Sequence, residues 1–153
     1  MKRFLCLGML MVLFITMIPI NAFATQESEN NDEIIYFDDG SYATIFLSDT
    51  GSRATTSKSG SKTYTYYSSS GVAQWKAVLS GTFTYTGTSS TCTASSCSVT
   101  IYKTDWYTVS KSASKSGNTA TAAVTMGRKM LGVTVDKKSI DISLSCDANG
   151  TLS

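Results

Sequence analysis

Hydrophobic and polar residues alternate with a period of two through much of the chain after residue 24. In the run 72–80 the apolar side chains share one face, and they are Ala73, Trp75, Ala77 and Leu79. Similar runs cover 63–66, 82–86, 97–101, 106–109, 120–126 and 133–146. Such alternation is typical of half-buried β-strands, and no later stretch repeats apolar residues at helical spacing over two turns. The pattern predicts an all-β domain, an antiparallel β-sandwich that is Ig-like in outline, with Trp75 in its core.

The first 24 residues have the pattern of an export signal. Lys2 and Arg3 form a basic start, residues 4–18 are mostly apolar, and Ala22 and Ala24 are the small residues that a signal peptidase needs. Residues 4–18 would form only about 22 Å of helix, against roughly 30 Å of membrane hydrocarbon. We therefore expect cleavage after Ala24, a secreted protein, and no stable membrane insertion after cleavage.

Composition divides the remaining chain into three parts. Residues 25–49 are acidic, and within them two apolar runs flank the turn signal 38–41, which predicts a β-hairpin separate from the main domain. Residues 50–61 are rich in Ser, Thr and Gly, which is typical of a linker. Residues 62–153 are then expected to form the β-sandwich domain.

Charge is segregated in the same way. Residues 25–49 contain seven acidic side chains and no basic one, whereas residues 50–153 contain eleven basic side chains and four aspartates. One interpretation is a basic body that binds an anionic polymer or membrane surface, with the acidic segment competing for the same surface. The other is that these charges only keep the faces of a sheet solvated. Nucleic acid is not expected as a partner, because the lysines are dispersed and no reading motif is present.

The composition also limits the chemistry that the protein could perform. The chain has no histidine, which excludes Ser-His-Asp and Cys-His catalytic sets and histidine metal sites. The carboxylates beyond residue 50 are Asp105, Asp136, Asp141 and Asp147. A glycosidase pair is conceivable from these, but Asp141 alternates with isoleucines on a solvent face, and the others lie in or beside turns. We therefore expect no enzyme activity, no catalytic residues, no metal and no cofactor.

Three cysteines, Cys92, Cys97 and Cys146, follow the signal, and Cys6 lies within it. An odd number allows at most one internal bridge, which export makes plausible. All three pairings stay open on the spacing alone, although a link from Cys92 to Cys146 would close the longest loop, with a gain of order 4 kcal/mol. Zinc is a poor alternative, because the paired C-x-x-C spacing is missing.

Binding is the function class that the composition favours. The region after residue 62 is rich in Tyr and Trp, and exposed rings beside hydroxyl groups can stack on sugars or contact proteins. The candidate ligand-binding residues are Asp105, Trp106, Tyr107 and Tyr67. The alternative is that these rings fill the sandwich. A threonine ladder at Thr82, Thr84, Thr86 and Thr88 resembles the hydroxyl arrays of ice-binding surfaces, but outward strand positions favour threonine in any case.

Several short phrases of the sequence form a recognisable set, at residues 60–66, 75–76, 81–85, 91–93, 115–121 and 144–146. Together they resemble a group of small secreted Ser/Thr-rich β-sandwich proteins of Gram-positive bacteria. The resemblance covers roughly residues 60–153 together with the signal and the acidic hairpin, and it implies no activity. It does imply a disulfide between Cys92 and Cys146, since these two cysteines stand in the matching phrases, with Cys97 as an extra thiol.

The sequence thus predicts a secreted, non-enzymatic binding module in the extracellular space or associated with the cell surface. Its expected ligand is a cell-wall glycan, an anionic wall polymer or a protein. The alternative is a bacteriocin-like effector or small toxin that is activated by removal of the acidic segment. The N-terminus of the secreted form separates the two, because it lies at Thr25 in the first case and near Thr50 in the second.

Overall fold

The computed structural model describes residues 33–50 and 56–153, and these residues form an all-β protein with eight strands. The strands are β1 (Glu33–Tyr36), β2 (Tyr42–Asp49), β3 (Ser57–Tyr67), β4 (Ala73–Tyr85), β5 (Ser90–Ile101), β6 (Trp106–Ser116), β7 (Thr119–Met130) and β8 (Val133–Ser145). The predicted signal peptide at 1–24, with its Cys6, lies outside the described residues.

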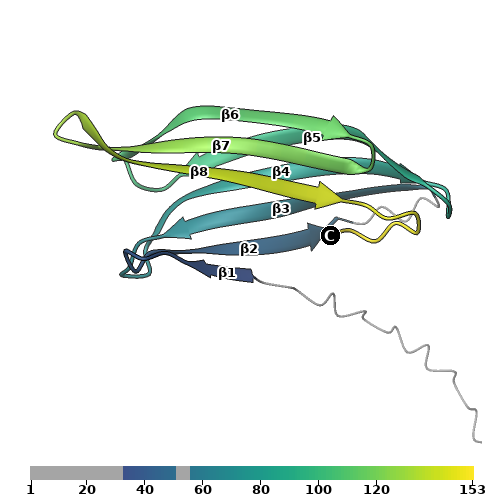
Figure 1. Cartoon of the computed structure of the whole chain (residues 1–153), viewed down its shortest axis with the longest axis horizontal. Coiled ribbons are helices and arrows are strands. Elements are labelled where there is room, and N and C mark those ends of the chain that lie inside the picture. The colour runs from purple at the N-terminus through teal and green to yellow at the C-terminus, as the bar shows by residue number, and fades with distance from the viewer. Residues whose placement is uncertain (1–32, 51–55) are drawn as a thin grey trace, which may run out of the picture.

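Two antiparallel sheets stack on each other, so the predicted β-sandwich is confirmed (Figure 1). Sheet A has the order β1-β2-β3-β4-β5, and sheet B has the order β6-β7-β8. Each strand pairs with its neighbour in sequence, so both sheets are meanders. The immunoglobulin fold has Greek-key connections instead. This protein therefore resembles the immunoglobulin fold in its two stacked sheets but differs from it in the connections between strands.

The predicted boundaries near the N-terminus differ from the structure. The acidic hairpin β1–β2 is not a separate unit, because β2 pairs with β3 along its whole length, from Tyr42 opposite Tyr67 to Asp49 opposite Gly60. Ser57 to Ser61, expected as linker, form the first part of β3, and residues 51–55 of that linker lie outside the described chain. Composition was misleading here because the serines face outward while the inward position at Gly60 is filled by the side chain of Leu152.

Four aromatic rings form the centre of the core and join the two sheets. Trp75 is fully buried, as predicted, and it stacks between Tyr64 and Tyr66 with centroid distances of 5.5 Å to each ring. Trp106 from sheet B meets Tyr66 edge-on at 5.4 Å. Among the described residues the Trp75 indole N–H has no hydrogen-bond acceptor. Leaving this donor unpaired costs about 1–3 kcal/mol, which burial of the large ring and its stacking contacts offset.

Sheet A is wider than sheet B. Strand β8 lies over β3 and β4, so the inner faces of β1 and β2 project past the edge of sheet B. The inner side chains of this overhang, such as Ile35 and Ile45, are only half-buried. The open side of the sandwich is therefore an apolar cleft between the β1–β2 hairpin and β8.

Burial of Tyr64 makes the free energy of unfolding depend on pH in the alkaline range. Burial and the neighbouring Tyr66 raise the pKa of Tyr64 to about 12, because both disfavour the phenolate. The folded state thus holds a proton that the unfolded chain releases near the ordinary tyrosine pKa of 10.0. This stabilisation is complete below that pH and is lost as pH rises through the folded pKa.

We therefore expect the free energy of unfolding to fall between pH 10 and about 12, and we expect Tyr64→Phe to make this fall shallower while the ring stack is kept. Urea denaturation of both proteins across this pH range measures the effect. An equally steep fall in the variant would contradict the prediction.

Candidate functional site

The structure separates the predicted binding residues into a buried one and three accessible ones. Trp106 is buried in the core, and its Nε1 donates a hydrogen bond to Oε1 of Gln74 at 3.3 Å. The structure thus places the Trp106 ring in the sandwich core, which is the alternative that the sequence left open for it. As the first residue of β6 it faces sheet A, where it packs against Tyr66 and Trp75, and its indole N–H is already satisfied.

Asp105 and Tyr107 support the base of the β7–β8 hairpin. Asp105 Oδ2 accepts a hydrogen bond from Arg128 Nε at 2.7 Å. The ring of Tyr107 covers Gly127, whose missing side chain leaves the space that the ring occupies, and the Tyr107 hydroxyl lies 2.8 Å from Thr134 Oγ1. Both residues are half-buried in these contacts. Their arrangement fixes the hairpin, while Trp106 faces the core.

Tyr67 belongs to a row of three tyrosines on the outer face of sheet A. Tyr36 lies opposite Tyr42 in the β1–β2 pair, and Tyr42 lies opposite Tyr67 in the β2–β3 pair. The rings of Tyr42 and Tyr67 are stacked at 4.8 Å between centroids with an interplanar angle of 8°, and Tyr36 follows at 5.9 Å. We call this set the tyrosine row. Tyr36 is 74% exposed, so the row is open to solvent at its outer end.

Hydroxyl groups cover most of the remaining outer face of sheet A. The register places Ser48, Ser61, Ser80 and Ser96 side by side across four strands. Ser59 and Thr82 lie within hydrogen-bonding distance, with 3.1 Å between their hydroxyl oxygens. Among the outward positions of β1 to β5, alternation leaves Lys76 as the charged one. The face is therefore mostly polar and nearly uncharged, with Ile34 and Phe46 as its exposed apolar residues.

Only part of the predicted threonine ladder belongs to this face. Thr82 and Thr84 lie on β4, but Thr86 and Thr88 come after the strand ends at Tyr85. Their hydroxyl oxygens are 3.1 Å apart in the following turn. A regular four-residue threonine array is therefore absent from the described β4 face.

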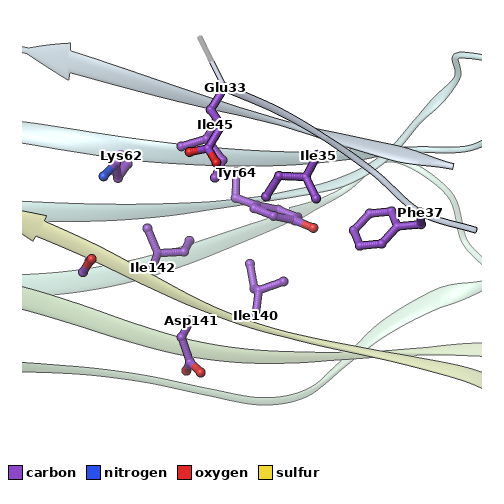
Figure 2. A pocket seen from close by; sticks show the side chains of 10 residues that line it. Glu33, Ile35, Phe37, Ile45, Lys62, Tyr64, Ile140, Asp141 and Ile142 are labelled. Atoms are coloured by element: carbon purple, nitrogen blue, oxygen red, sulfur yellow. The ribbon is translucent and has the colours of Figure 1, made fainter. Parts of the chain in front are cut away.

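The cleft on the open side of the sandwich has a volume of about 360 Å³. Its apolar walls come from the hairpin and β3 on one side and from β8 on the other, and they include Ile35, Ile45, Tyr64, Ile140 and Ile142. Figure 2 shows that Ile140 and Ile142 project into the cleft, whereas the carboxylate of Asp141 points away from it. The cleft thus offers mainly apolar contact, and Glu33 and Lys62 also line it.

Lys138 reaches from β8 to the turn of the acidic hairpin. Its Nζ lies 3.4 Å from Asp39 Oδ2 and within 6 Å of the ring centres of Phe37 and Tyr66, at 5.2 and 5.7 Å. Burial lowers the pKa of this ammonium, but Tyr66, Asp136 and Asp39 together raise it above its ordinary value. Hydrogen bonds from Ser41 hold the pKa of the Asp39 carboxyl below its usual range. Charge attraction therefore joins the acidic hairpin to sheet B.

A second ion pair joins the acidic segment to β3. Lys58 Nζ lies 2.6 Å from Asp49 Oδ2 at the far end of β2. The acidic segment and the basic remainder thus neutralise each other at two described points. The predicted contact between the acidic segment and the basic remainder of the chain is therefore present, but it forms part of the fold.

The three described cysteines are free thiols, so the predicted bridge between Cys92 and Cys146 is not formed in this structure. Both residues are nevertheless buried beside the same turn. The Cys92 amide donates to the carbonyl of Gly117 at 2.8 Å, and the Cys146 amide donates to that of Asn118 at 3.1 Å. Burial raises the pKa of both thiols, and the nearby Cys92 contributes to the shift at Cys146. Cys97 is half-buried elsewhere on β5.

Within residues 33–50 and 56–153, no group of three His, Cys, Asp or Glu side chains is placed to hold a metal ion. Nor do these ranges contain an apolar helix of a length that crosses a membrane. No protein-family model, curated protein or solved structure matches the chain.

Proposed function

We propose that this protein is a secreted, non-enzymatic binding module that acts at or near the cell surface and binds glycan on the outer face of sheet A. The observation that carries the proposal is the tyrosine row, in which three rings from three strands lie in adjacent register on an accessible face. The row leaves apolar ring surface open to a ligand, most of all at Tyr36, which is 74% exposed.

The surroundings of the tyrosine row favour a neutral glycan over an anionic polymer. The cross-strand contacts hold Tyr42 and Tyr67 in one stacked arrangement, so little side-chain freedom remains to be lost on binding. The adjoining serines and threonines offer donors and acceptors to sugar hydroxyls. A polyanion would need a cluster of cations, and this face carries Lys76 alone among its outward strand positions.

The placement of the carboxylates supports a non-enzymatic role. Asp105 is engaged by Arg128, and Asp141 faces away from the cleft (Figure 2). Asp147 Oδ1 accepts hydrogen bonds from the amides of Asn149 and Thr151 at 2.8 and 2.7 Å, and bonds within this turn lower its pKa. Each of these carboxylates therefore has a structural or solvent-facing position, and glycoside hydrolysis needs two that face one bond.

Removal of one ring from the tyrosine row is expected to weaken binding. We expect Tyr36→Ala and Tyr67→Ala each to lower the affinity for purified cell-wall polysaccharide at least fivefold, about 1 kcal/mol, because each removes a stacking surface. Tyr102→Ala is the matched control, since Tyr102 is exposed but lies outside the row. Pull-down on insoluble wall and glycan-array binding measure the effect.

Salt provides a second test of the same proposal. Binding by ring stacking should persist from low to high ionic strength, whereas attraction to an anionic polymer is screened. Equal binding by both variants and the wild type, or retention that disappears at high salt, would contradict the proposal.

The structure bears on the alternative of a processed effector. A chain that begins at Thr50 lacks β1 and β2, and with them the buried Ala43 and the partners of β3. It also loses the ion pairs of Asp39 and Asp49. We expect this shortened chain to unfold at least 10 °C below the chain that begins at Thr25, because Tyr64 and Tyr66 lose their cover. Calorimetry on the two proteins measures the difference, and equal melting temperatures would favour the effector.

We also infer that Cys92 and Cys146 form a disulfide after export. Oxidation would join the two Sγ atoms and release two protons and two electrons to an extracellular thiol–disulfide oxidant. The location of both thiols beside the turn at Gly117 and Asn118 supports this pairing.

Mass spectrometry of the secreted protein is expected to show one bridge and one titratable thiol, at Cys97. Cys92→Ser and Cys146→Ser should each destabilise the oxidised protein by about 4 kcal/mol, because the bridge closes a long loop in the unfolded chain. Cys97→Ser should leave the bridge intact. A bridge that includes Cys97, or three free thiols in the secreted form, would contradict the inference.

A further inference from the structure

We propose that the tip of the β7–β8 hairpin docks on the surface of an anionic phospholipid bilayer. The proposal concerns a surface distinct from the tyrosine row and does not depend on glycan binding. Its basis is an exposed apolar turn, a strained backbone at that turn, and flanking cations.

The tip exposes four apolar side chains together. Leu131 is 100% exposed, and Met130, Val133 and Val135 are 54%, 65% and 52% exposed. The hairpin extends past the other turns at its end of the molecule (Figure 1). A projecting group of large apolar residues is costly to leave in water, and it has the geometry required to enter a lipid interface ahead of the rest of the protein.

The turn keeps leucine at a position where that residue is unfavourable. Met130 pairs with Val133, so Leu131 and Gly132 form a two-residue loop, and both have positive φ, at 52° and 82°. Loops of this type favour Asn-Gly or Asp-Gly, because a left-handed backbone crowds a larger side chain. Among the described residues Leu131 is the one non-glycine with positive φ. Neither folding nor solubility accounts for leucine here, whereas insertion into lipid does.

Cations surround the apolar tip. The segment from Arg128 to Lys138 contains four basic residues and one aspartate. Arg128 and Lys138 take part in ion pairs of the fold, while Lys137 is exposed, and Lys129 is exposed with its Nζ 4.6 Å from the ring centre of Tyr107. Lysines that flank an inserted apolar group lie at the level of the lipid headgroups, where anionic phosphates attract them. This charge complementarity selects an anionic bilayer over a neutral one.

Side-chain contacts fix the base of the β7–β8 hairpin, which supports the tip when it contacts a bilayer. Tyr107 of β6 packs over Gly127 and reaches Thr134, and Asp105, which precedes β6, holds Arg128, so both strands of the hairpin are fixed near its base. The tip is thus presented on a rigid support, and little ordering cost remains to be met on docking.

Vesicle co-sedimentation tests the proposal with residues 25–153, which include every described strand and core residue. The wild-type protein should sediment with phosphatidylcholine vesicles that contain phosphatidylglycerol, and much less with pure phosphatidylcholine. Leu131→Asn should lower binding to the anionic vesicles at least tenfold, and its melting temperature should equal or exceed that of the wild type, because asparagine suits the left-handed turn. A folding defect therefore cannot imitate the expected loss.

Two further variants separate the contributions. Lys129→Gln and Lys137→Gln should each lower binding to the anionic vesicles about fivefold and leave binding to neutral vesicles unchanged. Val109→Asn is the matched control, since Val109 is 45% exposed on β6 but does not belong to the tip, and it should bind like the wild type. The proposal is overturned if the wild type fails to bind anionic vesicles, if Leu131→Asn binds them as well as the wild type, or if the tip is needed only for retention on a protein partner.

Discussion

The contact between four aromatic rings at the centre of the sandwich determines how the rest of the molecule is arranged. Trp75 lies between Tyr64 and Tyr66, and Trp106 brings sheet B against this stack. Because Tyr66 points into the core, its neighbour Tyr67 must point outward, where it joins the tyrosine row. The core therefore positions the candidate glycan surface directly. It also keeps Trp106 in the core, where its ring holds the two sheets together.

Alternation along the sequence was sufficient to predict the fold class and the buried position of Trp75, because a period of two has one structural meaning over runs of this length. It could not predict which residues become neighbours across strands. The pair of Tyr36 and Tyr42 could have been found from the turn at 38–41, which fixes the hairpin register. The third member, Tyr67, joins them only through the pairing of β2 with β3, and the sequence between those strands resembles a linker.

The predicted separation of charge has a structural explanation. The acidic segment supplies two strands of sheet A, and its ion pairs with Lys138 and Lys58 join it to β8 and β3. Lys138 also has a second effect, since an inward-pointing charge on an edge strand discourages pairing with other chains. Lys138, which attracts the hairpin turn through Asp39, thus lies at one end of the open cleft beside β8. Beside the β7–β8 tip, Lys129 and Lys137 remain exposed.

The meander order of both sheets has a consequence for how quickly this protein reaches its native state. Every strand finds its partner next to it along the chain, so the loops that must close during pairing are short, and each costs little entropy. Sandwiches with Greek-key crossings need distant segments to meet first and are slow for that reason. Here the long-range step is the docking of two finished sheets through their aromatic rings. Such a chain should therefore spend little time with unpaired strand edges, which are the features of a folding chain that promote aggregation.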